Sequence, residues 1–250
     1  MLVNLKEILK IADEKGIAVG AFNTPNLEAL NAVIGAAEER NCPVIINHAQ
    51  CHEYLIPLDV IGPIMVEAAK KAKVPVCVNL DHGEDLEYLG RALKIGFSSV
   101  MFDGSVLSYE DNIAGTKKAV EMAHAVGASV EGEIGVMTRR EGDESDVEET
   151  AENDNVDMYT KPDEAYDFVS KTGIDALACS FGTAHGIYLT APKLDFERLS
   201  AINEKISVPI VMHGGSGVSD EDYREVIKRG VRKINYYTYM AKAGGAAIKE

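Results

Sequence analysis

The sequence predicts an α/β protein in which a single domain, residues 1–250, forms a (β/α)8 TIM barrel. Eight short runs of mostly apolar residues alternate with segments of helical periodicity, and each run is apolar on both faces, as in a buried parallel strand. Eight such units in 250 residues match the usual size of this barrel. A doubly wound open sheet is the alternative, but the number of units and the lack of a GxGxxG motif favour closure.

The predicted strands follow one another at intervals of 23 to 47 residues. They begin near Ala18, Val44, Val76, Ser99, Ser129, Ala176, Pro209 and Lys233. Two of the intervening helices have clear start signals, Pro25 for one and the capping residue Ser219 for another. The longest interval contains residues 141–157, of which nine of seventeen are acidic and none is basic. This composition indicates a mobile, solvated loop near residues 137–160.

Composition and charge exclude several classes of protein. The net charge of −15 argues against nucleic acid and anionic membranes as partners, because both require a basic surface. No apolar run is long enough to span a membrane, and Lys6 and Glu7 interrupt any secretory signal at the N-terminus. The four cysteines are scattered without a CxxC motif, so a disulfide framework is not expected and a cytoplasmic location fits.

Three histidines follow predicted strands at the end of the barrel where active sites lie. His82, His185 and His213 come after the third, sixth and seventh strands, and each is followed by glycine. Three imidazoles with one open position form a common catalytic zinc site, although a single histidine of this kind is more often structural. The glycines are expected to let each ring approach the metal. His48 and His52 fit better as loop histidines, although they could bind a metal, and His124 as a surface residue of a helix.

Carboxylates accompany these histidines. Because adjacent residues at a strand end diverge, Asp81 is expected to point at the substrate while His82 binds the metal. Asp81 is then a candidate general acid/base; the alternative is a carboxylate that orients a histidine. Glu133 is either a transient metal ligand or an ordinary carboxylate at the barrel rim. The sequence HGGSG at 213–217 precedes a helix, which favours a phosphate there.

These motifs, in this order, resemble the class II, zinc-dependent ketose-bisphosphate aldolases, a family that includes fructose- and tagatose-bisphosphate aldolases. The likeness extends over nearly the whole chain. It is carried by AFNTPNLEAL near the start, LDHG at 80–83, EGEIG at 131–135, GTAHG at 182–186, PKLDF at 192–196, HGGSG at 213–217 and KIN at 233–235. The resemblance implies reversible cleavage of a ketose 1-phosphate or 1,6-bisphosphate to dihydroxyacetone phosphate and an aldehyde through a metal-stabilised enediolate.

The resemblance also implies roles for individual residues. His82, His185 and His213 match the ligands of one catalytic Zn²⁺, and Glu133 lies near an alternate metal position. Asp81 matches the acid/base that acts on the C4 hydroxyl, and Glu141 the loop residue that exchanges a proton at the dihydroxyacetone phosphate carbon. The candidate substrate- and phosphate-binding residues are Asn23, Gly186, Gly214, Ser216, Asn235 and Thr238. A monovalent cation, Na⁺ or K⁺, often accompanies the phosphate, and a homo-oligomer, either a dimer or a tetramer, is expected.

Several positions depart from the family pattern and point to an altered substrate preference. Ala49 and Gln50 occupy the second strand end, where the family commonly has serine, and Tyr237 and Tyr239 replace acidic or small residues after the last strand. Leu189 replaces a frequent lysine, and Thr138 and Arg139 stand where the loop usually has two glycines. Two other functions therefore remain open: a catalytically silent sugar-phosphate-binding relative, and a metal-dependent hydrolase on the same barrel. A Schiff-base aldolase using Lys233 is discounted.

Overall fold

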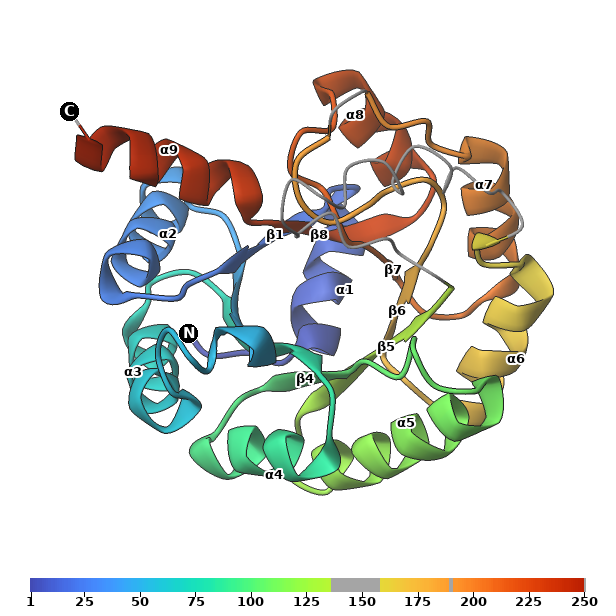
Figure 1. The fold of residues 1–250 in the computed structure, drawn as a ribbon, viewed down its shortest axis with the longest axis horizontal. Helices are drawn as coiled ribbons and strands as arrows, with labels where there is room; N and C mark the ends of the chain where they lie inside the picture. Colours follow the sequence, from blue (N-terminus) through green and yellow to red (C-terminus); the bar gives the residue numbers. More distant parts are fainter. Residues whose placement is uncertain (136–157, 189–190, 250) are drawn as a thin grey trace, which may run out of the picture.

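The structure, a computed structural model, describes residues 1–135, 158–188 and 191–249, and it confirms the closed barrel. Eight parallel strands pair in chain order, and β8 pairs with β1 to complete the ring (Figure 1). The strands are β1 (Val19–Asn23), β2 (Val44–Ala49), β3 (Val76–Gly83), β4 (Ser99–Phe102), β5 (Ser129–Ile134), β6 (Ala176–Cys179), β7 (Ile210–Met212) and β8 (Val231–Tyr236).

Most of the helices surround this ring, as Figure 1 shows. The helices are α1 (Leu5–Lys15), α2 (Leu27–Arg40), α3 (Leu58–Lys71), α4 (Leu86–Ile95), α5 (Tyr109–His124), α6 (Pro162–Thr172), α7 (Phe196–Lys205), α8 (Asp220–Lys228) and α9 (Thr238–Lys249), with the short 3-10 helix η1 (Gln50–His52) after β2. Among the described residues, no helix is both long and apolar enough to cross a membrane.

Element boundaries agree with the sequence analysis except at a few ends. Ser219 caps α8 as predicted, with its side chain accepting from the backbone N–H of Asp222. The helix expected to open at Pro25 begins two residues later, because Asn26 provides the cap. The last strand also begins earlier than predicted, at Val231 rather than Lys233. Its residues alternate between buried and half-buried, so it lacks the continuous buried run of strands such as β2.

Helix α1 closes the bottom of the barrel, a role that the sequence analysis did not assign. Its residues Leu5, Ile8, Leu9 and Ala12 recur at helical spacing and are fully buried. They pack against the inward-facing residues at the N-terminal ends of the strands, and α1 lies across the ring in Figure 1. Because this end is filled with apolar side chains, polar groups inside the barrel are confined to its other end.

Candidate active site

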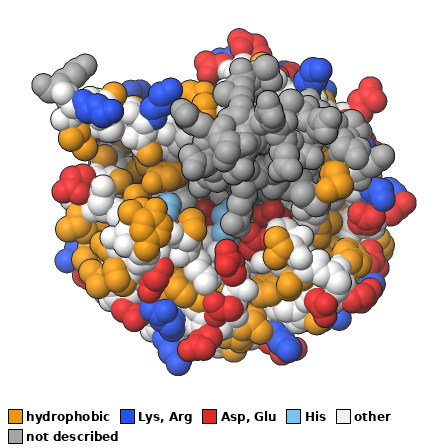
Figure 2. Space-filling view, viewed as in Figure 1, with side chains coloured by type: hydrophobic (Ala, Val, Ile, Leu, Met, Phe, Trp, Pro, Cys, Tyr) orange, Lys and Arg blue, Asp and Glu red, His pale blue; other side chains and the backbone are white. Residues whose placement is uncertain are grey.

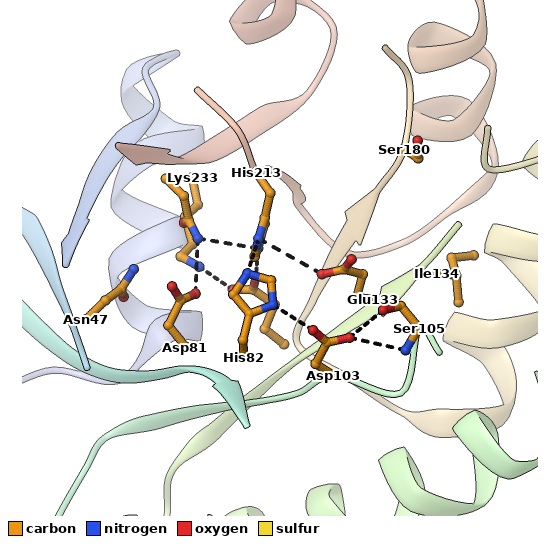
Figure 3. Close-up of polar contacts among 12 residues, drawn as sticks. Asn47, Asp81, His82, Asp103, Ser105, Glu133, Ile134, Ser180, His213 and Lys233 are labelled. Carbon is orange, nitrogen blue, oxygen red and sulfur yellow. Dashed lines mark hydrogen bonds and ion pairs between the residues drawn. The ribbon is translucent and has the colours of Figure 1, made fainter. Parts of the chain in front are cut away.

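The three predicted histidines meet at the C-terminal end of the barrel. His82 is in β3, His185 lies in the segment after β6, and His213 directly follows β7. Their ring centroids are 4.8 to 5.6 Å apart, and one nitrogen from each lies within 4.8 Å of the others. Residues separated by up to 131 positions in the chain thus form one cluster, in agreement with the prediction that the sheet closes. Figure 3 shows two of its members, His82 and His213, side by side.

A local irregularity of β3 brings the His82 ring into this cluster. Strict alternation along the strand would direct Asp81 into the barrel and His82 outward. The pairing of β3 with β4 shifts register between Leu80 and Gly83, however, and His82 has a φ of 47°, which is uncommon outside glycine. This backbone turn allows both side chains to reach the site.

Carboxylates fix the orientation of two of the rings. Nδ1 of His82 lies 2.7 Å from Oδ2 of Asp103, and Nε2 of His213 lies 2.7 Å from Oε1 of Glu131. The remaining nitrogens, Nε2 of His82 and Nδ1 of His213, face each other at 3.1 Å. A carboxylate behind a histidine is the usual arrangement around a protein metal site, because it fixes the ring and its tautomer.

These donors fit a zinc ion. Imidazole nitrogens are preferred zinc ligands, and Oε2 of Glu133 lies 4.0 Å from Nδ1 of His213. That oxygen is buried and has no hydrogen-bond partner among the residues that the structure describes. Burial, reinforced by nearby Asp103, raises the pKa of Glu133 to about 8. A bound cation would give this oxygen a partner and would lower the pKa of Glu133 again. Glu133 also groups with His82 and Asp103 as a second set of possible ligands.

Asp81 is held beside the histidines as a carboxylate. Its side chain is buried and accepts hydrogen bonds from Nδ2 of Asn235 at 3.1 Å and Nδ2 of Asn23 at 3.3 Å. Burial alone would raise the pKa of Asp81, but the positive charges of His82 and Lys233 outweigh it and lower the pKa to about 2. The group is therefore ionised at neutral pH and can accept a proton.

Behind Asp81, side-chain amides form a chain across three strands. Asn79 donates to Oδ1 of Asn47 at 3.1 Å, and Asn47 donates to Oδ1 of Asn23 at 3.2 Å. Asn23 then donates to Asp81. Each amide orients the next, so the hydrogen-bond donor of Asn23 is directed at the carboxylate.

Sequence reasoning missed a buried ion pair beneath the histidines. Nζ of Lys233 lies 2.6 Å from Oε2 of Glu131, and both side chains are completely buried. Burial would raise the pKa of Glu131, but Lys233 overcomes this effect and lowers it. Lys233 does not line the cavity, which also argues against a Schiff-base role. Alternation could have found the pair, because Glu131 shares the inward face of β5 with Glu133.

A cavity opens above these groups. It is lined by Asn23, Ala49, Cys51, His52, Asp81, His82, Glu84, His185, Gly186, Gly214, Gly215, Ser216, Asn235, Tyr236, Tyr237 and Thr238. All six candidate substrate- and phosphate-binding residues are in this set. Of the four candidate specificity residues, Ala49 and Tyr237 line the cavity. Gln50 instead bonds Asp85, and Tyr239 packs over Gly217. Glu141, Leu189, Thr138 and Arg139 lie outside the described residues.

The glycines that follow the histidines are required by the local backbone, and their expected role in letting each ring approach a metal stays a prediction. Gly214 has a φ of 65°, and a Cβ there would lie 2.3 Å from the carbonyl oxygen of Ala184. Gly186 has a φ of 96°. A Cβ on Gly83 would lie 2.3 Å from Leu89. These positions therefore require glycine for left-handed backbone or for close packing.

The remaining histidines do not join the cluster of three. His48 is a buried residue of β2, not of a loop, and its Nε2 lies 3.0 Å from the hydroxyl of Tyr88. Burial lowers its pKa to about 4. His52 lies in η1 with its ring 5.1 Å from that of Tyr237. His124 is partly exposed at the end of α5 and contacts Asp175 at 2.8 Å, in agreement with its predicted surface position.

Comparison with known proteins adds an independent line of evidence. The family model described as "Fructose-bisphosphate aldolase class-II" matches residues 3–250. The chain is 38% identical over 250 residues to the uncharacterized protein YdjI of Escherichia coli K12, covering all of this chain and 87% of that protein.

Solved structures are similar throughout. The crystal structure of the YdjI aldolase from E. coli K12 has a TM-score of 0.88 and 36% identity, covering all of this chain and 86% of that one. A putative fructose-1,6-bisphosphate aldolase from Coccidioides immitis has a TM-score of 0.86 and 31% identity, with 99% and 85% covered. Fructose-bisphosphate aldolase from Campylobacter jejuni has a TM-score of 0.76 and 25% identity, with 99% and 80% covered.

Proposed function

The chain belongs to the class II fructose-bisphosphate aldolase family, and on that premise we propose that it is a zinc-dependent aldolase acting on a phosphorylated ketose. The reaction is the reversible cleavage of a ketose 1-phosphate or 1,6-bisphosphate to dihydroxyacetone phosphate and an aldehyde. The observation that supports the proposal most directly is the cluster of three imidazoles at the end of the barrel. Carboxylates orient two of these rings, and an ionised aspartate lies beside the cluster.

The residues that would hold the metal are His82, His185 and His213, with Glu133 as a carboxylate within reach. A bound Zn²⁺ supplies Lewis-acid stabilisation of negative charge on the substrate oxygens. Asp103 and Glu131 hold two of the rings in the orientation that this binding requires.

Asp81 performs the proton transfer. In the cleavage direction its carboxylate accepts the proton of the C4 hydroxyl, the C3–C4 bond breaks, and the bonding electron pair remains on C3. Asn23 and Asn235 keep the carboxylate directed at the cavity during this step. Proton delivery to C3 then completes dihydroxyacetone phosphate, and Glu141 is the candidate donor. In the synthetic direction the same groups act in reverse.

The first phosphate is assigned to the loops after β6, β7 and β8. Gly186, Gly214 and Ser216 line this side of the cavity, and Thr238 lies at the N-terminal end of α9, which favours an anion. A nearby Na⁺ or K⁺, a dimeric or tetrameric assembly and a cytoplasmic location remain predictions.

The experiment is a coupled assay for dihydroxyacetone phosphate with a panel of ketose phosphates, performed on the zinc-loaded protein, after chelation and after zinc is restored. We expect cleavage of at least one ketose phosphate, loss of activity after chelation and recovery with zinc. Phosphate-ester hydrolysis in place of carbon–carbon cleavage would contradict the proposal, as would activity that persists after complete metal removal.

A further inference from the structure

Three asparagines of neighbouring strands lie at one level of the barrel interior. Asn23 of β1 pairs in register with Asn47 of β2, and Asn47 pairs in register with Asn79 of β3. The residues two positions earlier in each of these strands belong to the apolar cluster that packs against α1. Because side chains alternate along a strand, the three amides point into the barrel just above that cluster. We call Asn23, Asn47 and Asn79 the amide row.

Only one end of the amide row reaches the cavity. Asn23 lines the cavity, whereas Asn47 and Asn79 do not, and both of these are completely buried. Histidine side chains are visible from outside on the face of the molecule that Figure 2 shows, but Asn47 and Asn79 have no exposed surface. The two inner amides therefore have no contact with a substrate in the cavity. Any effect that they have on turnover has to pass through residues that do.

The carboxylate of Asp81 sets the direction of every amide in the row. An ionised carboxylate accepts hydrogen bonds and donates none, so Asn23 has to present its Nδ2 to Oδ2 of Asp81, as it does at 3.3 Å. Oδ1 of Asn23 then accepts from Asn47 at 3.2 Å, and Oδ1 of Asn47 accepts from Asn79 at 3.1 Å. Turning the amide of Asn47 around would place oxygen against oxygen on one side and nitrogen against nitrogen on the other.

The inner end of the amide row carries an unfavourable group. Oδ1 of Asn79 is buried and has no hydrogen-bond partner among the residues that the structure describes. A buried carbonyl oxygen of this kind destabilises the folded state, and an apolar side chain in its place would remove it. In the described part of the chain, the amide of Asn79 makes one hydrogen bond, the one that orients Asn47. The side chain is thus better suited to directing the row than to stabilising the barrel.

From this geometry, and resting on the proposed function, we propose that Asn47 and Asn79 are positioning residues of the cleavage reaction, which act through Asn23 to hold the carboxylate of Asp81 where it accepts the C4 hydroxyl proton. Proton transfer requires the base to lie within hydrogen-bond distance of the proton that it removes, so a small displacement of the carboxylate lowers the rate. The effect of removing an amide should decrease with its distance from Asp81 along the row.

The test measures kcat and KM of the zinc-loaded protein with the ketose phosphate that the unmodified protein cleaves fastest. Asn47→Leu removes the hydrogen bonds at a similar side-chain size and should lower kcat by about tenfold, with KM changed by less than about twofold. Asn79→Leu, one amide further from Asp81, should lower kcat by about threefold. Zinc content should be unchanged in both variants, because neither residue belongs to the three-histidine cluster.

A double variant separates positioning from a general effect on structure. Asn23→Ala removes the amide through which the row acts, and this change should itself lower kcat. Adding Asn47→Leu to Asn23→Ala should then lower kcat by less than about twofold, because no amide is left to orient. Residues that act independently would instead give losses that multiply.

Asn79→Leu keeps the test decisive if Asn47→Leu does not fold. It removes the oxygen of Asn79 that has no partner among the described residues, and its loss of kcat should likewise disappear in the Asn23→Ala background. Ser99→Ala is the matched control. Ser99 of β4 pairs in register with Asn79 and is fully buried, but its hydroxyl has no hydrogen-bond partner in the described part of the chain, so kcat should be unchanged.

The outcomes distinguish this inference from the proposed function. Unchanged kcat in folded, zinc-loaded Asn47→Leu and Asn79→Leu would overturn the role of the amide row and leave the aldolase proposal standing. Losses that multiply with that of Asn23→Ala would do the same. If the unmodified zinc-loaded protein cleaves no ketose phosphate, the proposed function fails and the inference fails with it.

Discussion

The lower and upper halves of the barrel interior differ in polarity: apolar side chains fill the lower half, and charged and amide side chains occupy the upper half. In the lower half, Leu5 and Leu9 of α1 pack against small and branched side chains such as Ala21 and Ile45, and this apolar core stabilises the fold. In the upper half, the same inward-facing positions of the strands carry Glu131, Lys233 and other charged or amide side chains that are equally buried. Buried polar groups cost free energy unless they are paired, so they are retained where they serve chemistry.

The largest effect on activity is expected at Asp81, in the upper half. Asp81→Asn removes the proton acceptor and keeps one oxygen that can still accept a hydrogen bond from Asn23 or Asn235, so kcat should fall by about 10²- to 10⁴-fold. Zinc content, measured by metal analysis, should be unchanged because Asp81 is outside the three-histidine cluster. Activity near that of the unmodified protein would remove Asp81 from its proposed role.

Breaking the ion pair between Lys233 and Glu131 tests whether the buried charges of the upper half are tolerated because they are paired. Lys233→Met leaves the Glu131 carboxylate buried without the lysine charge that balances it, with only His213 as a partner, and the free energy of unfolding should fall by about 3–5 kcal/mol. The measurement is chemical denaturation. Adding Glu131→Gln to this variant should recover part of the loss, since the uncompensated charge is removed; a purely additive double variant would contradict the pairing.

The lower half should affect stability and leave the chemistry intact. Leu9→Ala removes a fully buried side chain of α1 and should lower the free energy of unfolding by about 2–5 kcal/mol. Below the unfolding temperature, kcat should stay within about twofold of the unmodified value. A large loss of kcat in a folded Leu9→Ala sample would contradict the view that the lower half stabilises the fold without affecting the chemistry of the upper half.

A smaller effect is expected from pH, through His48. Its pKa falls from the ordinary 6.5 to about 4 because the ring is buried, so between these values the unfolded chain binds more protons than the folded one. Stability should therefore decrease as pH falls, by up to about 2 kcal/mol between pH 7 and pH 5 from this group. Denaturation of His48→Gln at both pH values should show a correspondingly smaller decrease, and an identical decrease would contradict the assignment.

Much of the fold and site was predictable because strand ends follow simple rules. The apolar runs located β2 to β6 at their starting residues, and the order of the strands placed His82, His185 and His213 on one rim. The position of α1 was not predictable from alternation, because its apolar face is that of any amphipathic helix. The turn at His82 was hidden as well, since only a register shift in β3 brings its ring inward.

Buried polar side chains show a second limit of prediction from a single sequence. The sequence predicts that a strand begins at Lys233, although this residue is an inward-facing residue two positions into β8. The sequence favours a loop position for His48 near the end of the second strand, whereas the residue is buried in β2 and contacts Tyr88 of α4. In both cases the partner comes from a distant part of the chain, and a single sequence does not identify that partner.

The central claim, that His82, His185 and His213 form one zinc site, is tested most directly by anomalous diffraction at the zinc edge from crystals of the metal-loaded protein. We expect a single strong peak at about 2.0–2.1 Å from Nε2 of His82, Nδ1 of His213 and one ring nitrogen of His185. An active, zinc-loaded crystal without a peak among these rings would contradict the claim.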